Sequence, residues 1–242
     1  GSCTAMKYAL EKIGKEVALI SKDQLSESLG EMKIAKEVEF GKDITEMNLK
    51  DFDIFLGVDT STPEMGGKFK KNYTIPKDIF VINIDHHTTN MFYGDLNYVD
   101  DKQPSACSIV LELLKDKIKF DKELSTRLLL GLCTDSGFFT YGKASEKAME
   151  QAAFLIENGG DYYDGVVFPI LHNQPLNLMK YYSLLVMKLR FDEKKRFAYS
   201  ITTAEEIKRL KLNKADVRLG PNYLASIKEF EFIFTMAELD EE

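Results

Sequence analysis

The residues best suited to chemistry in this sequence stand three in a row, Asp85-His86-His87. The chain has 3 histidines, and two of them lie here, directly after the apolar segment 79–84. A carboxyl group and two imidazoles at the end of a buried strand are costly to remove from water unless they bind something. Carboxylate and imidazole ligands together suit Mn²⁺, Fe²⁺ or Zn²⁺, and oxygen-rich sites favour Mn²⁺ or Mg²⁺. The triplet therefore indicates a metal site, and an ordinary surface loop is the alternative when the triplet is taken alone.

Two further aspartates could complete such a site. Asp59 follows the strand-like segment 52–58, and Asp135 stands at a predicted helix end where Gly137 permits a tight turn. Each aspartate alone is also an ordinary turn former. Finding both aspartates together with the triplet along one α/β pattern is much less expected by chance than finding any one of them alone. We therefore expect Asp59 to converge with His86 on one ion.

The elements that must position these residues alternate between strands and helices. Strands are expected at 17–20, 52–58 and 79–84, and helices at 2–13, 105–114, 123–133 and 145–157. Such alternation predicts an α/β fold with a doubly wound, mainly parallel sheet. Ligands of these sheets bind outside the carboxyl ends of the strands, which is where Asp59 and Asp85 stand.

The pattern changes after about residue 175. A helix is expected at 176–186, and the spacing of Thr203 and Glu206 predicts a capping box at the start of another helix. Apolar residues that recur at every second position predict half-buried strands, the first two joined as a hairpin. These strands are expected at 187–191, 197–201 and 230–236.

These patterns predict two domains. We expect the first domain over residues 1–175, a connector helix over 176–187, and the start of a smaller α/β domain over 188–242. We expect this second domain to be incomplete at Glu242, because three strands and one clear helix bury little surface.

Composition excludes several classes of protein. The chain carries 32 basic and 39 acidic residues, a net charge of −7, so a broad basic surface for duplex DNA is not expected. No uncharged apolar segment approaches the roughly 20 residues of a membrane span, so no membrane partner is expected. The 3 cysteines are widely spaced, form no CxxC motif and lie in apolar segments, as buried thiols of a cytoplasmic protein do.

Taken together, the motifs resemble those of the DHH phosphoesterase superfamily, and within it the NrnA-type nanoRNases and 3′-phosphoadenosine-5′-phosphate phosphatases. The resemblance covers roughly residues 1–190 well and the remainder loosely. The matching segments are Gly1-Ser2, Val58-Asp59-Thr60, Ile84-Asp85-His86-His87, Thr89-Asn90, Gly94 and Thr134-Asp135-Ser136-Gly137-Phe138-Phe139.

The resemblance implies a site with two divalent ions, usually Mn²⁺, with Mg²⁺ or Fe²⁺ as alternatives. It implies that Asp59 bridges the ions and that His86 and Asp135 complete the coordination of one of them. His87 would lie against the scissile phosphate, and Asp85 would orient a neighbouring imidazole.

The resemblance also implies substrate contacts and a place for the missing ligands. Ser2 and Arg218 are the further residues expected to contact substrate. The family's first motif, a His followed by Asp-x-Asp, would precede Gly1, and its glycine-rich substrate loop would follow Glu242. The aromatic residues at 138, 139 and 141 favour core packing over base stacking, and the lysines at 68, 70 and 71 favour a solvated loop over phosphate binding.

The implied function is a metal-dependent phosphohydrolase of short single-stranded oligoribonucleotides and of 3′-phosphoadenosine-5′-phosphate. Cyclic di-AMP or linear dinucleotide hydrolysis is a close alternative, and manganese pyrophosphatase activity is the next. A non-catalytic nucleotide-binding module is the alternative if the first metal motif is absent from the protein. The assembly state is left open, with a homodimer as one option.

Overall fold

The computed structural model describes residues 1–67, 75–140 and 145–239. It divides the chain into two compact units. Unit 1 comprises residues 1–23 and 33–168, and unit 2 comprises residues 24–32 and 169–242. The three lysines at 68, 70 and 71 and the tyrosine at 141, considered above as substrate contacts, lie outside the described residues.

A parallel sheet forms the centre of unit 1. Its strands are β3 (Ile54–Val58), β4 (Phe80–Asp85) and β5 (Leu96–Val99), in the order β3-β4-β5. Val58 pairs with Ile84, and both pairings are parallel, so the carboxyl ends of the strands share one edge. The predicted α/β fold with a parallel sheet is confirmed.

Unit 1 also contains a separate two-stranded parallel sheet. It joins β1 (Ile20–Ser21) to β2 (Glu39–Phe40). The strand predicted at 17–20 therefore begins only at Ile20, because only Ile20 and Ser21 have a pairing partner among the described residues.

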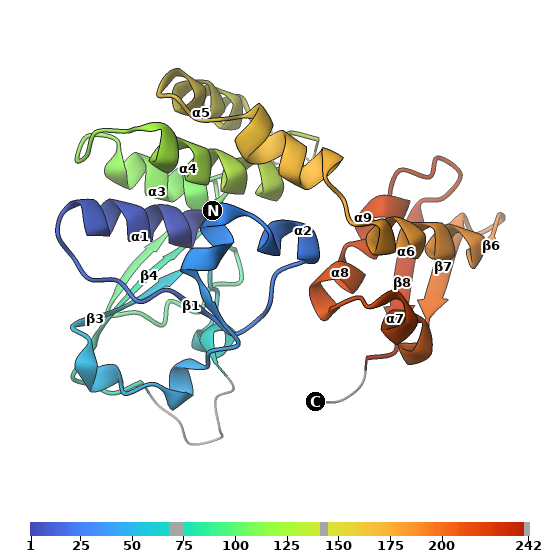
Figure 1. Cartoon of the computed structure of the whole chain (residues 1–242), viewed down its shortest axis with the longest axis horizontal. Coiled ribbons are helices and arrows are strands. Elements are labelled where there is room, and N and C mark those ends of the chain that lie inside the picture. Colours follow the sequence, from blue (N-terminus) through green and yellow to red (C-terminus); the bar gives the residue numbers. More distant parts are fainter. Residues whose placement is uncertain (68–74, 141–144, 240–242) are drawn as a thin grey trace. The chain divides into compact units, whose positions relative to one another are not determined.

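Four helices stand on one side of the strands of unit 1 (Figure 1). They are α1 (Ser2–Lys12), α3 (Ala106–Leu114), α4 (Lys122–Asp135) and α5 (Glu146–Glu157). Ser105, Asp121 and Ser145 cap the last three, each side chain accepting a hydrogen bond from a backbone N–H of the first turn. The helices predicted from periodicity are confirmed, with ends shifted by no more than two residues.

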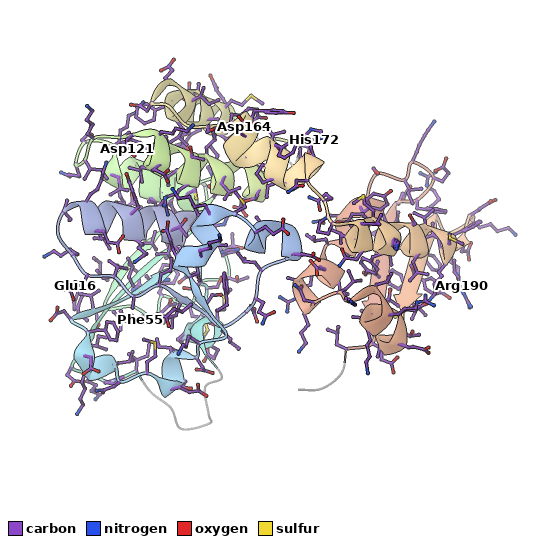
Figure 2. The ribbon with its side chains drawn as sticks, in the orientation of Figure 1. Glu16, Phe55, Asp121, Asp164, His172 and Arg190 are labelled. Atoms are coloured by element: carbon purple, nitrogen blue, oxygen red, sulfur yellow. The ribbon has the colours of Figure 1, made fainter. Side chains whose placement is uncertain are left out.

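A small apolar cluster, formed by residues within 44–81, packs against the strands of unit 1. It joins Ile44 and Leu49, in the short helices η2 (Ile44–Glu46) and η3 (Leu49–Asp51), to Val81 of β4. Phe55, labelled on β3 in Figure 2, packs against the same cluster. The remaining short elements are α2 (Glu27–Gly30), η1 (Lys33–Glu37), η4 (Pro63–Gly66) and η5 (Tyr163–His172).

Unit 2 packs helices on a mixed three-stranded sheet. Its elements are α6 (Leu176–Met187), β6 (Arg190–Asp192), β7 (Phe197–Thr202), α7 (Ala204–Leu210), α8 (Lys214–Arg218), α9 (Gly220–Leu224) and β8 (Phe232–Ala237). β6 and β7 form the predicted hairpin, and β8 pairs with β7 in parallel. The capping box of Thr203 and Glu206 is confirmed. The strand predicted to begin at residue 187 is wrong, because Met187 is the last residue of α6.

Unit 2 also includes a segment from early in the chain. The backbone N–H of Glu27 donates to Asp216 Oδ1 at 3.0 Å, and Asn213 Nδ2 donates to the carbonyl oxygen of Leu25 at 3.1 Å. Residues 24–32 therefore pack with α8, which is far from them in sequence.

The cysteines are free thiols, as predicted, but Cys3 is only partly buried, whereas all three were expected to be buried. Cys107 and Cys133 are buried, and burial raises the pKa of each to about 12, so both act as packing residues. Within the described parts of the chain, no helix combines the length and apolar character that a membrane crossing requires.

Candidate metal centre

The candidate site lies at the carboxyl edge of the unit 1 sheet. Asp85 is the last residue of β4, and Asp59 follows β3. The backbone N–H of Asp59 donates to the carbonyl oxygen of Ile84 at 2.8 Å, so the two strands stay joined up to this point. Asp59 has a φ of 63°, in the left-handed region that Asp and Asn tolerate better than most residues.

Three elements bring acidic and imidazole groups together here. His86 Nε2 lies 3.6 Å from Asp59 Oδ1 and 3.2 Å from Asp135 Oδ2. Asp135 is the last residue of α4, so a helix end reaches the edge of the sheet. Asp59, His86 and His87 each offer a ligand atom, and these atoms lie within 4.8 Å of one another.

Two of these ligand atoms lack a hydrogen-bond partner. Asp59 Oδ1 and His86 Nε2 are buried, and neither forms a hydrogen bond within the described part of the chain. Buried polar atoms are normally paired, because an unpaired one costs free energy. Two carboxylates and an imidazole nitrogen that face one another fit a divalent cation such as Mn²⁺, Mg²⁺, Fe²⁺ or Zn²⁺. The residues present therefore fit the predicted group.

The imidazole of His86 is oriented for coordination. Its Nδ1 lies 3.4 Å from the carbonyl oxygen of Gln103, which can only accept a hydrogen bond. In the tautomer in which Nδ1 donates to this carbonyl oxygen, Nε2 presents its lone pair towards Asp59 and Asp135. A backbone carbonyl that fixes the tautomer in this way is a common partner of metal-binding histidines.

Asp85 holds the second histidine. Its Oδ1 lies 2.7 Å from His87 Nδ1 and accepts from the backbone N–H of His86 at 2.8 Å. Burial alone would raise the pKa of Asp85, but hydrogen bonds from Asn90, His87 and His86 outweigh it and lower that pKa. Asp85 is therefore a buried carboxylate, and His87, whose side chain is 41% exposed, keeps Nε2 available for a ligand.

The electrostatics of Asp59 favour a cation. Burial, and then the negative charge of Asp135, raise the pKa of the Asp59 carboxyl, while His86 and His87 lower it. Two carboxyl groups that repel each other are stabilised by a positive ion between them.

Ser2, a predicted substrate contact, belongs to unit 1, and Arg218, the other one, belongs to unit 2. Ser2 begins α1 and is only 7% exposed. The first turn of α1 packs closely on α4, where a Cβ at Gly1 would lie 2.6 Å from Gly131 Cα. Arg218 is exposed at the end of α8 in unit 2. The structure brings Asp59, Asp85, His86, His87 and Asp135 into one cluster in unit 1.

Residues that support the site were not assigned a role from the sequence. Gln103 orients His86, and the buried amide of Asn90 donates to Asp85 Oδ2 at 2.6 Å. Asn83 is fully buried within β4. A polar residue inside the apolar segment 79–84 was the available signal, since a buried amide requires hydrogen-bond partners.

Comparisons with known proteins find relatives that match part of the chain. A bifunctional oligoribonuclease and PAP phosphatase NrnA of Thermus thermophilus is 34% identical over 86 residues, which is 35% of this chain and 26% of that protein. A protein of the same name from Bacillus subtilis is 25% identical over 122 residues, 49% of this chain and 38% of that one. The matches thus span well under half the length of these curated relatives.

The fold has a close counterpart among solved structures. An exopolyphosphatase-related protein from Bacteroides fragilis superposes with a TM-score of 0.82 and 19% identity, over 94% of this chain and 68% of that one. At this identity the likeness shows the fold alone.

The assignment of the chain to a family rests on a match to a protein-family model. The model of the DHH family, N-terminal domain, matches residues 1–133, more than half of the chain. The matched segment contains Asp59, Asp85, His86 and His87 and ends two residues before Asp135. The chain belongs to the DHH family.

Proposed function

We propose that the chain carries the metal-binding part of a cytoplasmic phosphoesterase that hydrolyses short oligoribonucleotides and 3′-phosphoadenosine-5′-phosphate. The observation that supports this most directly is the convergence of Asp59, His86 and Asp135, two of whose ligand atoms are buried without a hydrogen bond. The names of the NrnA relatives support the substrate class.

In this proposal Asp59 would help to hold two divalent ions, with Mn²⁺ as the metal proposed. His86 Nε2 and an Asp135 oxygen would bind one of them. When bound, the ions supply Lewis-acid stabilisation of phosphoryl oxygens and a water of lowered pKa. Gln103 contributes by keeping His86 in the tautomer that leaves Nε2 unprotonated.

His87 has a separate role in the proposal. Asp85 accepts the Nδ1–H of His87 and holds the ring, so Nε2 is the nitrogen that contacts the scissile phosphate. When Nε2 of His87 carries a proton, it can donate a hydrogen bond to a phosphoryl oxygen. Ser2 and Arg218 remain predicted substrate contacts.

A hydrolysis panel tests the proposal. The protein is assayed with diribonucleotides, 3′-phosphoadenosine-5′-phosphate, cyclic di-AMP and pyrophosphate, with Mn²⁺ and then with EDTA. We expect Mn²⁺-dependent turnover of the first two substrates. Preferential hydrolysis of cyclic di-AMP or of pyrophosphate would instead select one of the alternative activities.

A matched pair of variants connects turnover to the site. Asp135→Asn removes one charge from the cluster and should lower turnover by more than about 100-fold. Asp161→Asn is the control, since Asp161 pairs with Lys122 at the other end of α4. Nucleotide binding without turnover of any substrate would overturn the enzyme proposal and favour a binding module.

A further inference from the structure

A buried network of polar side chains lies under the candidate metal centre. Asn90 is 7% exposed, and Asn83 and Asp85 are fully buried. Asn90 Nδ2 lies 2.6 Å from Asp85 Oδ2, 2.8 Å from Asn83 Oδ1 and 3.2 Å from the carbonyl oxygen of Thr60. All three neighbours are hydrogen-bond acceptors in this arrangement.

The orientation of the Asn90 amide is determined by its surroundings. Its Oδ1 accepts from the backbone N–H of Phe92 at 2.7 Å, so the amide nitrogen must face the three acceptors. Asn83 is fixed in the same way, because its Nδ2 donates to the carbonyl oxygen of Thr60 at 3.0 Å and to the Tyr93 hydroxyl at 3.2 Å. Tyr93 in turn lies 2.7 Å from Thr60 Oγ1.

The network joins the two loops that carry the metal-ligand candidates. Thr60 follows Asp59 in the loop after β3, and Asp85 precedes His86 at the end of β4. Asn90 reaches both loops with one amide group. A buried network in which each member is paired is rigid, because breaking one bond leaves an unpaired polar atom in a low-dielectric interior.

We propose that Asn90 is a positioning residue for the metal centre. By donating to Asp85 and to the carbonyl oxygen of Thr60, it sets the separation of Asp59 from His86 and His87. Asn83 and Tyr93 extend the same connection. This inference rests on the proposed function, because it assigns Asn90 a role in holding the residues that would bind the ions.

Asn90→Asp is the decisive variant. It preserves the shape of the side chain and the acceptor for Phe92 N–H, but it places a carboxylate oxygen against three acceptors. We expect the Kd for Mn²⁺, measured by calorimetry on the full protein, to rise by about tenfold or more, with a comparable fall in kcat. Circular dichroism establishes that the variant is folded.

Asn97→Asp is the matched control. Asn97 Nδ2 donates to the carbonyl oxygen of Gly94 at 2.7 Å, and Oδ1 accepts from Gly94 N–H at 2.9 Å, so the same substitution also removes a partly buried donor. Asn97 has no hydrogen bond to Asp85. We expect lower thermal stability from Asn97→Asp and an unchanged Kd for Mn²⁺.

A reciprocal exchange tests the contact directly. In the double variant Asp85→Asn/Asn90→Asp, the amide and the carboxylate trade places, so the hydrogen bond between positions 85 and 90 can form in reverse. We expect the double variant to bind Mn²⁺ more tightly than the sum of the two single losses predicts. Losses that add without coupling would overturn the proposal.

A milder variant covers the case in which Asn90→Asp fails to fold. Tyr93→Phe removes only the hydroxyl between Thr60 and Asn83, and we expect the Kd for Mn²⁺ to rise about threefold to tenfold. A wild-type Kd in Asn90→Asp, or in Tyr93→Phe if the former is unfolded, would overturn the positioning role. If the wild-type protein itself binds no Mn²⁺, it is the proposed function that fails.

Discussion

The two three-stranded sheets differ in how burial runs along their strands. In β3 and β4 of unit 1, burial increases towards the carboxyl ends, so that Val58, Asp85 and His86 are almost fully enclosed. In β7 of unit 2, burial alternates, with Ala198 and Ser200 enclosed and the residues between them partly open. The first sheet encloses polar groups at one edge, whereas the second has one packed face and one open face.

Both sheets contain buried polar atoms without a hydrogen bond, and the contrast shows which of them indicate a site. In unit 2, Ser200 Oγ and Thr202 Oγ1 are such atoms, but they belong to neutral hydroxyls. In unit 1, Asp59 Oδ1 and His86 Nε2 are ligand atoms that converge with a third group, His87. The convergence of charged or coordinating atoms is therefore more informative than a missing hydrogen bond alone.

The largest expected effect follows from removing the charge of Asp59. Asp59→Asn keeps a residue that tolerates the left-handed backbone, so the fold should persist. We expect Mn²⁺ binding to be lost and turnover to fall by more than about 100-fold. In EDTA the free energy of unfolding should stay equal or rise by less than about 1 kcal/mol, because a partly buried carboxyl beside Asp135 is removed. Calorimetry and thermal melts with and without Mn²⁺ measure both effects.

Asp192→Asn makes the same exchange in the other sheet. Asp192 accepts a backbone hydrogen bond from Lys195 in the hairpin, and an asparagine can still accept it. We expect Mn²⁺ to raise the melting temperature of this variant as it does for the wild type. Normal Mn²⁺ binding by Asp59→Asn would show that binding does not need the Asp59 carboxylate, and the inferred difference in function between the two sheets would be wrong.

An intermediate effect is expected from Gly57→Ala in β3. A Cβ at position 57 would overlap the Tyr93 hydroxyl and lie 2.9 Å from Thr60 Oγ1. Tyr93 must shift, which should cost about 1–3 kcal/mol of unfolding free energy and weaken Mn²⁺ binding. Gly30→Ala is the control, since nothing lies within 4 Å of its Cβ and helix α2 favours alanine. Equal stability of the two variants in urea unfolding would contradict close packing at Gly57.

The positions of the main ligand candidates along the chain could be predicted from the sequence. Asp59 and Asp85 follow apolar segments long enough to be buried strands, and parallel strands place their carboxyl ends at one edge. The approach of Asp135 to His86 could not be predicted in the same way, because it depends on the length and packing of α4. Distances of this kind come from tertiary contacts, which periodicity does not contain.

Other features were missed for local reasons. β5 (Leu96–Val99) mixes polar and apolar residues and therefore lacks a clear strand pattern. At residues 187–191 the alternation of apolar residues overlapped the end of α6, whose own apolar face includes Tyr181 and Leu185. The packing of residues 24–32 with α8 rests on hydrogen bonds between residues 189 positions apart, which no local signal predicts.

The smallest effect is expected on the open face of the unit 2 sheet. Tyr199 and Phe234 are cross-strand partners on β7 and β8, with ring centroids 5.5 Å apart and planes inclined by 10°. Because Phe234 is 43% exposed, Phe234→Thr should lower the free energy of unfolding by only about 0.5–1 kcal/mol and leave Mn²⁺ binding unchanged. A double-mutant cycle with Tyr199→Thr isolates the contribution of the pair. A loss above about 3 kcal/mol would mean that this face is enclosed in the folded protein, and the contrast between the two sheets would then rest on the metal centre alone.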